Sequence, residues 1–185
     1  MIRRYLITDP LYYTQDPKNF LSTLSRSLKD HSVDFALYRD KRNPDYETIA
    51  QEFVPLCKRN HVKPILHQNY LLAQRLGAYG VHLLFSQRDK IKTAKKLGLF
   101  VIISTHTEDE IQEAVKLGVD AVVYSPIFET PNKGIPKGLA HLKEIVGKIN
   151  TKIIALGGIT TDEQVKAVES CGVFAYASIR KFIKA

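Results

Sequence analysis

The sequence predicts an α/β fold, a single (β/α)8 TIM barrel of minimal length, and three observations lead to this prediction. Short apolar runs alternate with amphipathic stretches along all 185 residues. Eight such pairs follow one another about 24 residues apart, as expected of β-α units. The apolar runs are nearly continuous, as in strands that are covered on both faces. Eight units favour a closed barrel, and an open doubly wound sheet is the alternative.

The strands are expected where β-branched, leucine and aromatic residues cluster, because such side chains fit a covered sheet. They are residues 5–8, 33–38, 62–66, 81–85, 100–104, 121–124, 152–156 and 174–179. The helices are expected between them, where apolar residues recur at helical spacing. They are residues 20–28, 46–56, 70–76, 90–97, 108–117, 139–149 and 162–169, with a stub at 181–185. The glycines that stand where helix C-caps belong are Gly77, Gly98, Gly118 and Gly172.

Length and composition indicate one domain spanning residues 1–185. The chain is 44% hydrophobic and 25% charged, an ordinary soluble composition. No apolar run approaches the roughly 20 residues that span a bilayer, and the N-terminus has no signal-like segment. We therefore expect a cytoplasmic protein without a membrane partner. Cys57 and Cys171 lack metal-site spacing and are expected to be small buried residues.

The charge of the chain points to the chemistry of its partner. A net charge of +8 favours anionic partners such as phosphate esters or pyrophosphates. The basic residues are scattered and do not alternate with aromatic residues, so nucleic acid is not an expected partner. A small phosphorylated molecule is the partner that remains, and formation of a homodimer is left open.

In a barrel of this kind the active site lies at the C-terminal ends of the strands. The candidates at or near those ends are Asp9, Arg39, Asp40, Lys41, His67, Gln68, Asn69, His82, Ser104, Thr105, His106, Thr130, Asn132, Lys133, Gly157, Gly158, Ala177 and Ser178. Thr130, Asn132 and Lys133 belong to a long polar loop of residues 124–138. Such loops are more often functional than idle, and a solvated surface loop is the alternative.

Two strand ends predict a phosphate site. Gly157 and Gly158 end the seventh strand, and Ala177 and Ser178 end the eighth. Barrels most often bind phosphate there, through backbone N–H groups. Glycine lets the backbone approach the anion closely, although any tight turn can use a glycine pair.

A second basic pair follows the second strand, where Arg39 and Lys41 flank Asp40. An arginine fork beside a lysine suits a phosphate or a pyrophosphate. The alternative is a solvated Arg–Asp pair at a strand end.

His106 is the candidate acid/base, because it lies beyond the fifth strand and histidine exchanges protons near neutral pH. Thr107 and Glu110 have the capping-box spacing, so a histidine that only helps to cap a helix is the alternative. His82 lies inside an apolar run and is expected in the core. The roles of His67 and Arg180 are left undecided.

Six short motifs stand at or just after expected strands, in this order along the chain: I-T-D, R-D-K, A-Y-G-V-H, S-T-H, P-I-F-E-T and A-L-G-G-I. With them the chain resembles the thiamine phosphate synthase superfamily over nearly its whole length. One branch of that superfamily joins a pyrimidine pyrophosphate to a thiazole phosphate and uses magnesium. The TenI-type branch is a thiazole tautomerase, which makes a thiazole phosphate carboxylate aromatic by moving a proton.

The synthase branch implies magnesium aspartates after strands three and four, where this chain has Gln68 and Gln87. A neutral amide oxygen does not neutralise a dication as a carboxylate does. Leu37 and Asn132 also stand where the synthase pattern has glutamine and threonine. The resemblance therefore implies no metal ligands and no cofactor, with magnesium required only if the chain is a synthase.

The tautomerase branch matches the F-E-T of residues 128–130 and the S-T-H motif, and it implies that His106 moves the proton. The residues implied to bind the substrate are Arg39, Lys41, Ser104, Thr130, Asn132 and Lys133. Those implied to hold its phosphate are Gly157, Gly158, Ala177 and Ser178. We therefore expect a thiazole tautomerase, an isomerase of thiamine biosynthesis. A synthase (a transferase) with an altered metal site is the alternative, and a non-catalytic phosphate-binding regulator is the second alternative.

Overall fold

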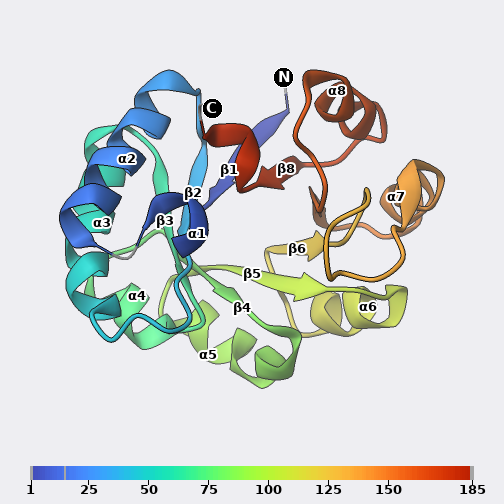
Figure 1. Ribbon diagram of the computed structural model, residues 1–185. Coiled ribbons are helices and arrows are strands. Elements are labelled where there is room, and N and C mark those ends of the chain that lie inside the picture. Colours follow the sequence, from blue (N-terminus) through green and yellow to red (C-terminus); the bar gives the residue numbers. More distant parts are fainter. Residues whose placement is uncertain (1, 15, 184–185) are drawn as a thin grey trace.

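The computed structural model describes residues 2–14 and 16–183, and within them eight parallel strands close into a barrel. Each strand pairs with the next one in the chain, and β8 returns to β1 with Tyr5 opposite Ala177. Figure 1 shows the helices arranged around these strands. The pairing of β1 with β8 confirms the barrel that the sequence predicts and excludes the open doubly wound sheet.

The strands are β1 Arg3–Ile7, β2 Phe35–Tyr38, β3 Lys63–His67, β4 Gly80–Leu83, β5 Phe100–Thr105, β6 Ala121–Tyr124, β7 Lys152–Leu156 and β8 Ala175–Ser178. All eight overlap the apolar runs of the sequence. Phe85 was expected in the fourth strand but opens the 3-10 helix η1 (Phe85–Lys90). The chain turns there because the Gln87 side-chain oxygen accepts a hydrogen bond from the Leu84 N–H at 3.2 Å.

The helices are α1 Pro10–Tyr13, α2 Pro17–Asp30, α3 Tyr46–Arg59, α4 Tyr70–Arg75, α5 Ile91–Lys96, α6 Glu108–Lys116, α7 Gly138–Lys148 and α8 Asp162–Ser170. No periodic pattern in the sequence predicts α1, which Asp9 caps by accepting a hydrogen bond from the Leu11 N–H at 3.1 Å. In place of the stub expected at 181–185, the chain forms the 3-10 helix η2 (Arg180–Phe182). Residues 184 and 185 lie outside the described part.

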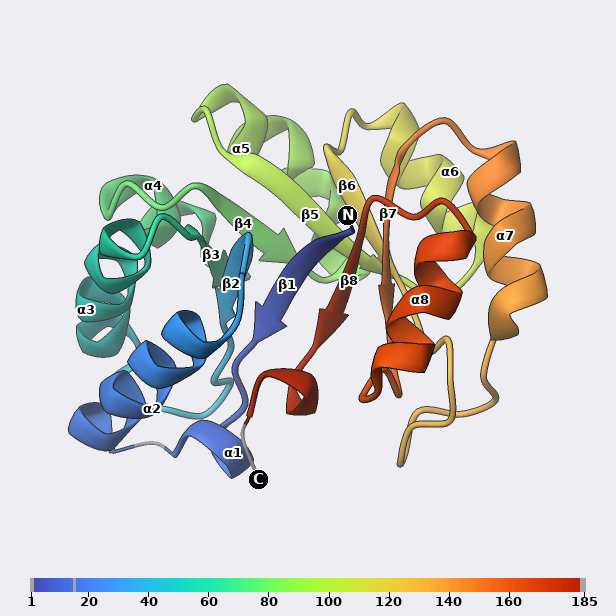
Figure 2. The ribbon, with the colours of Figure 1, turned by 90° about the horizontal axis from the view of Figure 1, so that it is seen from above.

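Inward-facing side chains of the strands form their own apolar core inside the barrel: Tyr5, Ile7, Phe35, Leu37, Ile65, Ile102, Ala121, Val123, Ile154, Ala175 and Ala177. The same two-residue alternation continues toward the rim. Arg39 lies two positions beyond Leu37, and Ser104 lies two positions beyond Ile102. In Figure 2 the arrowheads of β1 and β8 point to the end of the barrel where α1 lies, which identifies the C-terminal rim.

The helices bury their apolar faces against the outside of the barrel, with residues such as Leu24, Phe53 and Ile111 fully covered. Cys57 and Cys171 are free and buried, as expected. Within residues 2–14 and 16–183, no helix combines the length and apolar character that a membrane crossing requires.

Candidate active site

Several cavities open at the C-terminal rim, and two of them are neighbours that together hold most of the predicted site residues. The polar cavity has a volume of about 310 Å³, and its polar lining residues are Arg39, Lys41, His82, Ser104, His106, Ser125, Thr130 and Lys133. The glycine cavity has a volume of about 240 Å³, and its lining includes Gly157, Gly158, Thr160, Ala177, Ser178 and Arg180. The two cavities adjoin, because both are lined by Thr130, Leu156, Gly157 and Ile179.

Gly157 and Gly158 turn the chain sharply after β7. Their φ angles of 107° and 69° lie in the left-handed region, which strains L side chains. A Cβ atom on Gly157 would lie 2.7 Å from the Pro126 Cα, and one on Gly158 would lie 2.6 Å from the Glu129 carbonyl oxygen. Packing against the loop of residues 124–138 therefore requires glycine at both positions, whatever the two residues bind.

The Ser178 hydroxyl makes its hydrogen bonds within the protein. It donates to the Ile159 carbonyl at 2.7 Å and accepts from the Lys181 N–H at 3.2 Å, so the main chain of Ser178 is what remains for an anion. Arg180, which the sequence left undecided, lines the same cavity. Bare backbone beside a guanidinium group suits a phosphate.

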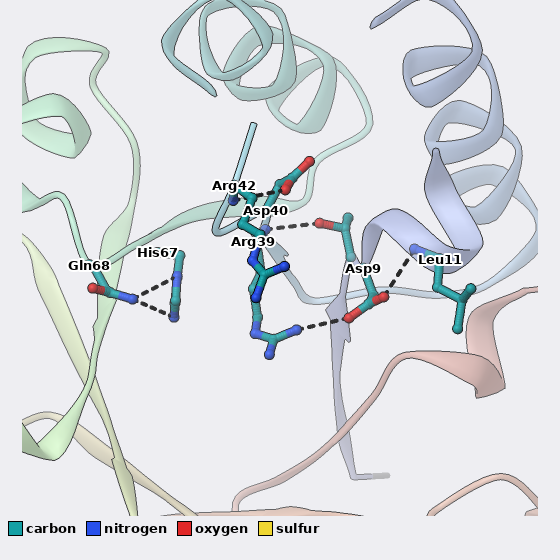
Figure 3. Close-up of polar contacts among 8 residues, drawn as sticks. Asp9, Leu11, Arg39, Asp40, Arg42, His67 and Gln68 are labelled. Carbon is teal, nitrogen blue, oxygen red and sulfur yellow. Dashed lines mark hydrogen bonds and ion pairs between the residues drawn. The ribbon is translucent and has the colours of Figure 1, made fainter. Parts of the chain in front are cut away.

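Arg39 and Lys41 bring positive charge to the polar cavity. Figure 3 shows the Arg39 guanidinium held by Asp9, with Nη1 donating to Oδ2 at 2.9 Å. Asp9 also caps α1, so the guanidinium is fixed to a rigid element. Burial, together with the neighbouring charges of Arg39 and Lys133, lowers the pKa of Lys41. These cations repel one another, and an anion bound among them would relieve that repulsion.

His106 follows β5 and lines the polar cavity with its ring exposed. Its Nδ1 lies 3.0 Å from the Ser125 carbonyl, which can only accept, so Nδ1 carries a proton. Thr107 caps α6 by accepting from the Glu110 N–H at 3.2 Å, as expected. The Glu110 carboxylate accepts from the backbone N–H of His106 at 2.6 Å. The backbone of His106 thus takes part in capping, whereas its imidazole does not.

Two further histidines lie deeper in the barrel. His82 is 4% exposed, and burial, followed by the nearby His67 and Arg39, lowers its pKa to about 3. His67 is 8% exposed, and burial, followed by Arg39 and Lys41, lowers its pKa to about 4. Both rings are therefore neutral near pH 7. His82 is buried, as expected, yet it also reaches the polar cavity, a role that its inward position on β4 could have signalled.

Two of the three predicted site residues in the loop of residues 124–138 line the cavities, and the third does not. Thr130 lines both cavities and Lys133 lines the polar cavity. Asn132 is exposed, has a φ of 61°, and lines neither of these two cavities. It belongs to a turn in which the Lys133 N–H donates to the Thr130 carbonyl at 3.2 Å, and asparagine tolerates the left-handed conformation there.

The residues at the rim do not suit a magnesium ion. The Gln87 side-chain oxygen is occupied by the Leu84 N–H, and the Gln68 side-chain nitrogen contacts the His67 ring at 3.3 Å (Figure 3). Asp9 is paired with Arg39, and Asp40, which is 6% exposed, accepts from the Arg42 N–H at 3.3 Å. This burial also rules out a solvated Asp40. In residues 2–14 and 16–183, no three histidine, cysteine, aspartate or glutamate side chains gather as metal ligands.

Comparison with known sequences identifies relatives over nearly the whole chain. The model of the TMP-TENI family, described as thiamine monophosphate synthase, matches residues 4–182. "Putative thiamine-phosphate synthase 2" of Aquifex aeolicus (strain VF5) is 33% identical over 188 aligned residues, 98% of each chain. "Thiamine-phosphate synthase" of Serratia proteamaculans (strain 568) is 33% identical over 167 residues, 85% of this chain and 78% of its own.

Solved structures share the fold. Thiamine phosphate pyrophosphorylase from Pyrococcus furiosus superimposes with a TM-score of 0.81 at 24% identity, covering 96% of this chain and 85% of its own. The N-acetylmannosamine-6-phosphate 2-epimerase from Clostridium perfringens has a TM-score of 0.76 at 14% identity, covering 98% and 87%. At these identities the likeness concerns the fold alone. On its sequence match across residues 4–182, the chain belongs to the thiamine monophosphate synthase (TMP-TENI) family of thiamine-biosynthetic enzymes.

Proposed function

We propose that this protein is a thiazole tautomerase, which makes a thiazole phosphate carboxylate aromatic by moving a proton. The observation that carries the proposal is the place of His106. Its imidazole lines a cavity with Arg39, Lys41 and Lys133, and no carboxylate of the described residues joins that lining. A tautomerisation needs one group that takes and returns a proton, and it has no leaving group to stabilise. An exposed histidine beside these cations, His106, meets that need.

The ring of His106 is oriented for this work. Because Nδ1 donates to the Ser125 carbonyl at 3.0 Å, the neutral ring has its lone pair on Nε2. Nε2 accepts a proton from a thiazole ring carbon and returns it at another position, so the reaction consumes no proton. Negative charge that develops on the substrate in between is stabilised by Arg39, Lys41 and Lys133.

The two cavities fit the two charged ends of such a substrate. Ile7, Leu37 and Leu156 give the polar cavity an apolar surface for a flat ring. The cations of the same cavity suit the ring carboxylate. The adjoining glycine cavity, with Gly157, Gly158 and Arg180, suits the phosphate. An anionic group at each end of a small ring accounts for the basic character of both cavities.

A thiamine phosphate synthase is the second candidate, and the names of the relatives favour it, since both sequence relatives described above are named as synthases. The synthase reaction releases pyrophosphate, whose several negative charges call for a dication. Gln68 and Gln87 offer neutral oxygens in place of the two aspartates of the synthase pattern, and Gln87 is already hydrogen-bonded to the backbone. These residues do not fit magnesium, and on that chemical ground we propose the tautomerase, although the names of the relatives favour the synthase.

Two assays on the purified protein separate the candidates. We expect aromatisation of the thiazole phosphate carboxylate without added magnesium, and an unchanged rate after treatment with EDTA. We expect no thiamine phosphate from the pyrimidine pyrophosphate and thiazole phosphate, even with millimolar magnesium. Robust, magnesium-dependent formation of thiamine phosphate would overturn the tautomerase assignment in favour of the synthase.

Replacing Arg180 by glutamine is expected to weaken binding of the thiazole phosphate about 10- to 100-fold, because hydrogen bonds to charged groups are worth about 1.5–3 kcal/mol. The matched control is Lys181→Gln, whose ammonium pairs with Asp162 at 2.7 Å. Calorimetric titrations with the thiazole phosphate and with its dephosphorylated alcohol measure the effect. If Arg180→Gln weakened both ligands equally, Arg180 would not contact the phosphate.

A further inference from the structure

Three polar groups form a line from the centre of the barrel to the polar cavity: Tyr5, His82 and Ser104. The Tyr5 hydroxyl lies 3.0 Å from the His82 Nδ1, and the His82 Nε2 lies 2.9 Å from the Ser104 Oγ. Tyr5 is fully buried and His82 is 4% exposed, whereas Ser104 is partly exposed and lines the cavity. The proposed chemistry uses neither Tyr5 nor His82, so this buried series of hydrogen bonds requires its own explanation.

The direction of the first hydrogen bond follows from the burial of Tyr5. A hydroxyl carries one hydrogen to donate and two lone pairs to accept with. Among the hydrogen bonds of the described residues, His82 is the sole partner of the Tyr5 hydroxyl. If His82 donated from Nδ1, the Tyr5 hydrogen would be left without an acceptor in the core, a loss that buried donors rarely suffer. Tyr5 therefore donates, and the His82 Nδ1 accepts.

The second hydrogen bond follows from the first. A buried, neutral imidazole carries a single proton, and the low pKa of His82, about 3, keeps the ring neutral. With Nδ1 accepting from Tyr5, that proton sits on Nε2. Nε2 then donates to the Ser104 Oγ at 2.9 Å. Because Ser104 accepts from Nε2 through one of its two lone pairs, its hydroxyl does not donate to His82 and keeps its hydrogen for another partner.

We propose that Tyr5 and His82 are positioning residues that lock the Ser104 hydroxyl as a hydrogen-bond donor to the substrate in the polar cavity. Arg39, Lys41 and Lys133, which line the same cavity, likewise donate and cannot accept. The ligand group beside Ser104 is therefore an acceptor, such as a carboxylate or an unprotonated ring nitrogen. A ligand that placed an N–H there would leave the Ser104 hydroxyl hydrogen without an acceptor. This inference rests on the proposed function only for the choice of ligand.

The protonated nitrogen of His82 can be measured without any ligand. In 15N-labelled protein, long-range 1H–15N spectra distinguish a protonated ring nitrogen from an unprotonated one, and the His82→Gln variant assigns the signals. We expect a neutral ring at pH 7 with the proton on Nε2. In Tyr5→Phe, which retains the ring and removes the hydroxyl, this preference should be lost or reversed. A proton on Nδ1 in the wild-type protein, or a charged ring, would overturn the proposal.

Binding supplies the second test, with the thiazole phosphate carboxylate as the probe in calorimetry. We expect Ser104→Ala to weaken binding about 10- to 100-fold, as for loss of a hydrogen bond to a charged group. Tyr5→Phe should weaken it about 3- to 10-fold in the wild-type background and have no effect in Ser104→Ala, because the two act through one interaction. Tyr13→Phe, which removes a hydroxyl from a buried tyrosine outside both cavities, is the matched control and should bind normally.

Additive losses in the double variant Tyr5→Phe/Ser104→Ala would show that Tyr5 acts through general packing, and the proposal would fail. If the probe did not bind the wild-type protein while His82 carried its proton on Nε2, the proposed function would be at fault and the locked Ser104 donor would stand. The two outcomes are therefore distinguishable.

Discussion

Replacing His106 by alanine is expected to slow aromatisation of the thiazole phosphate carboxylate about 10²- to 10⁴-fold, the usual contribution of a placed acid/base. The side chain is exposed and its imidazole takes no part in capping α6, so stability should be little affected. Substrate affinity should also change little, because the cations and the glycine cavity remain. Steady-state kinetics should therefore show a loss in kcat with a nearly constant KM.

His141→Ala is the matched control, because His141 is a partly exposed histidine on α7 that lines neither cavity. Its kcat should equal that of the wild-type protein. Added imidazole should restore part of the activity of His106→Ala, since the vacated space lies beside the cavity. A wild-type kcat in His106→Ala would remove His106 from the chemistry and leave the imidazole without an assigned role.

Replacing Gly158 by alanine is expected to reduce the free energy of unfolding by about 3 kcal/mol. Two effects combine: the φ of 69° strains an L residue, and the new Cβ would lie 2.6 Å from the Glu129 carbonyl oxygen and 2.7 Å from the Phe128 Cβ. The loop of residues 124–138 would have to move, which would displace Thr130 and Lys133 from the cavities. Urea denaturation measures the stability, and calorimetry measures the accompanying loss of phosphate binding.

Gly98→Ala separates the two effects. Gly98 has a φ of 79°, and a Cβ added there would meet no atom within 4 Å, so only the conformational strain of about 1 kcal/mol applies. The difference between the two variants reports the contact with the loop. Equal losses of stability in both variants would mean that the loop yields freely and that Gly158 is not needed for packing.

The order and class of the strands could be read from the sequence because each apolar run carries its own local signal. Val122 and Val123 in β6, for example, are both fully buried, on opposite faces of the strand. The short elements η1 and α1 could not be predicted from the sequence pattern, because each depends on one side chain that accepts a hydrogen bond from the backbone. Gln87 turns the chain after β4, and Asp9 caps the turn after β1. Such a bond leaves no periodic pattern.

The sequence could predict that the candidate site lies at the C-terminal rim, but not which rim residues line its cavities. The rule that strand ends carry the site places Arg39, Ser104 and His106 together. That rule also selects Asn132, which has a left-handed backbone conformation and lines neither of the two cavities. The rule does not include Arg180, because its place in the glycine cavity depends on how η2 folds back after β8.

By itself the sequence determined the eight alternating units, the basic charge and the two neutral amide residues Gln68 and Gln87 after the third and fourth strands. Only the tertiary structure decided that the Arg39 guanidinium pairs with Asp9 and that the Ser178 hydroxyl donates to the Ile159 carbonyl. The same holds for the hydrogen bonds that link Tyr5 to Ser104 through His82. The physical reason is that each of these contacts joins residues far apart in the chain. Their distances depend on the closure and register of the barrel, which no local pattern of residues encodes.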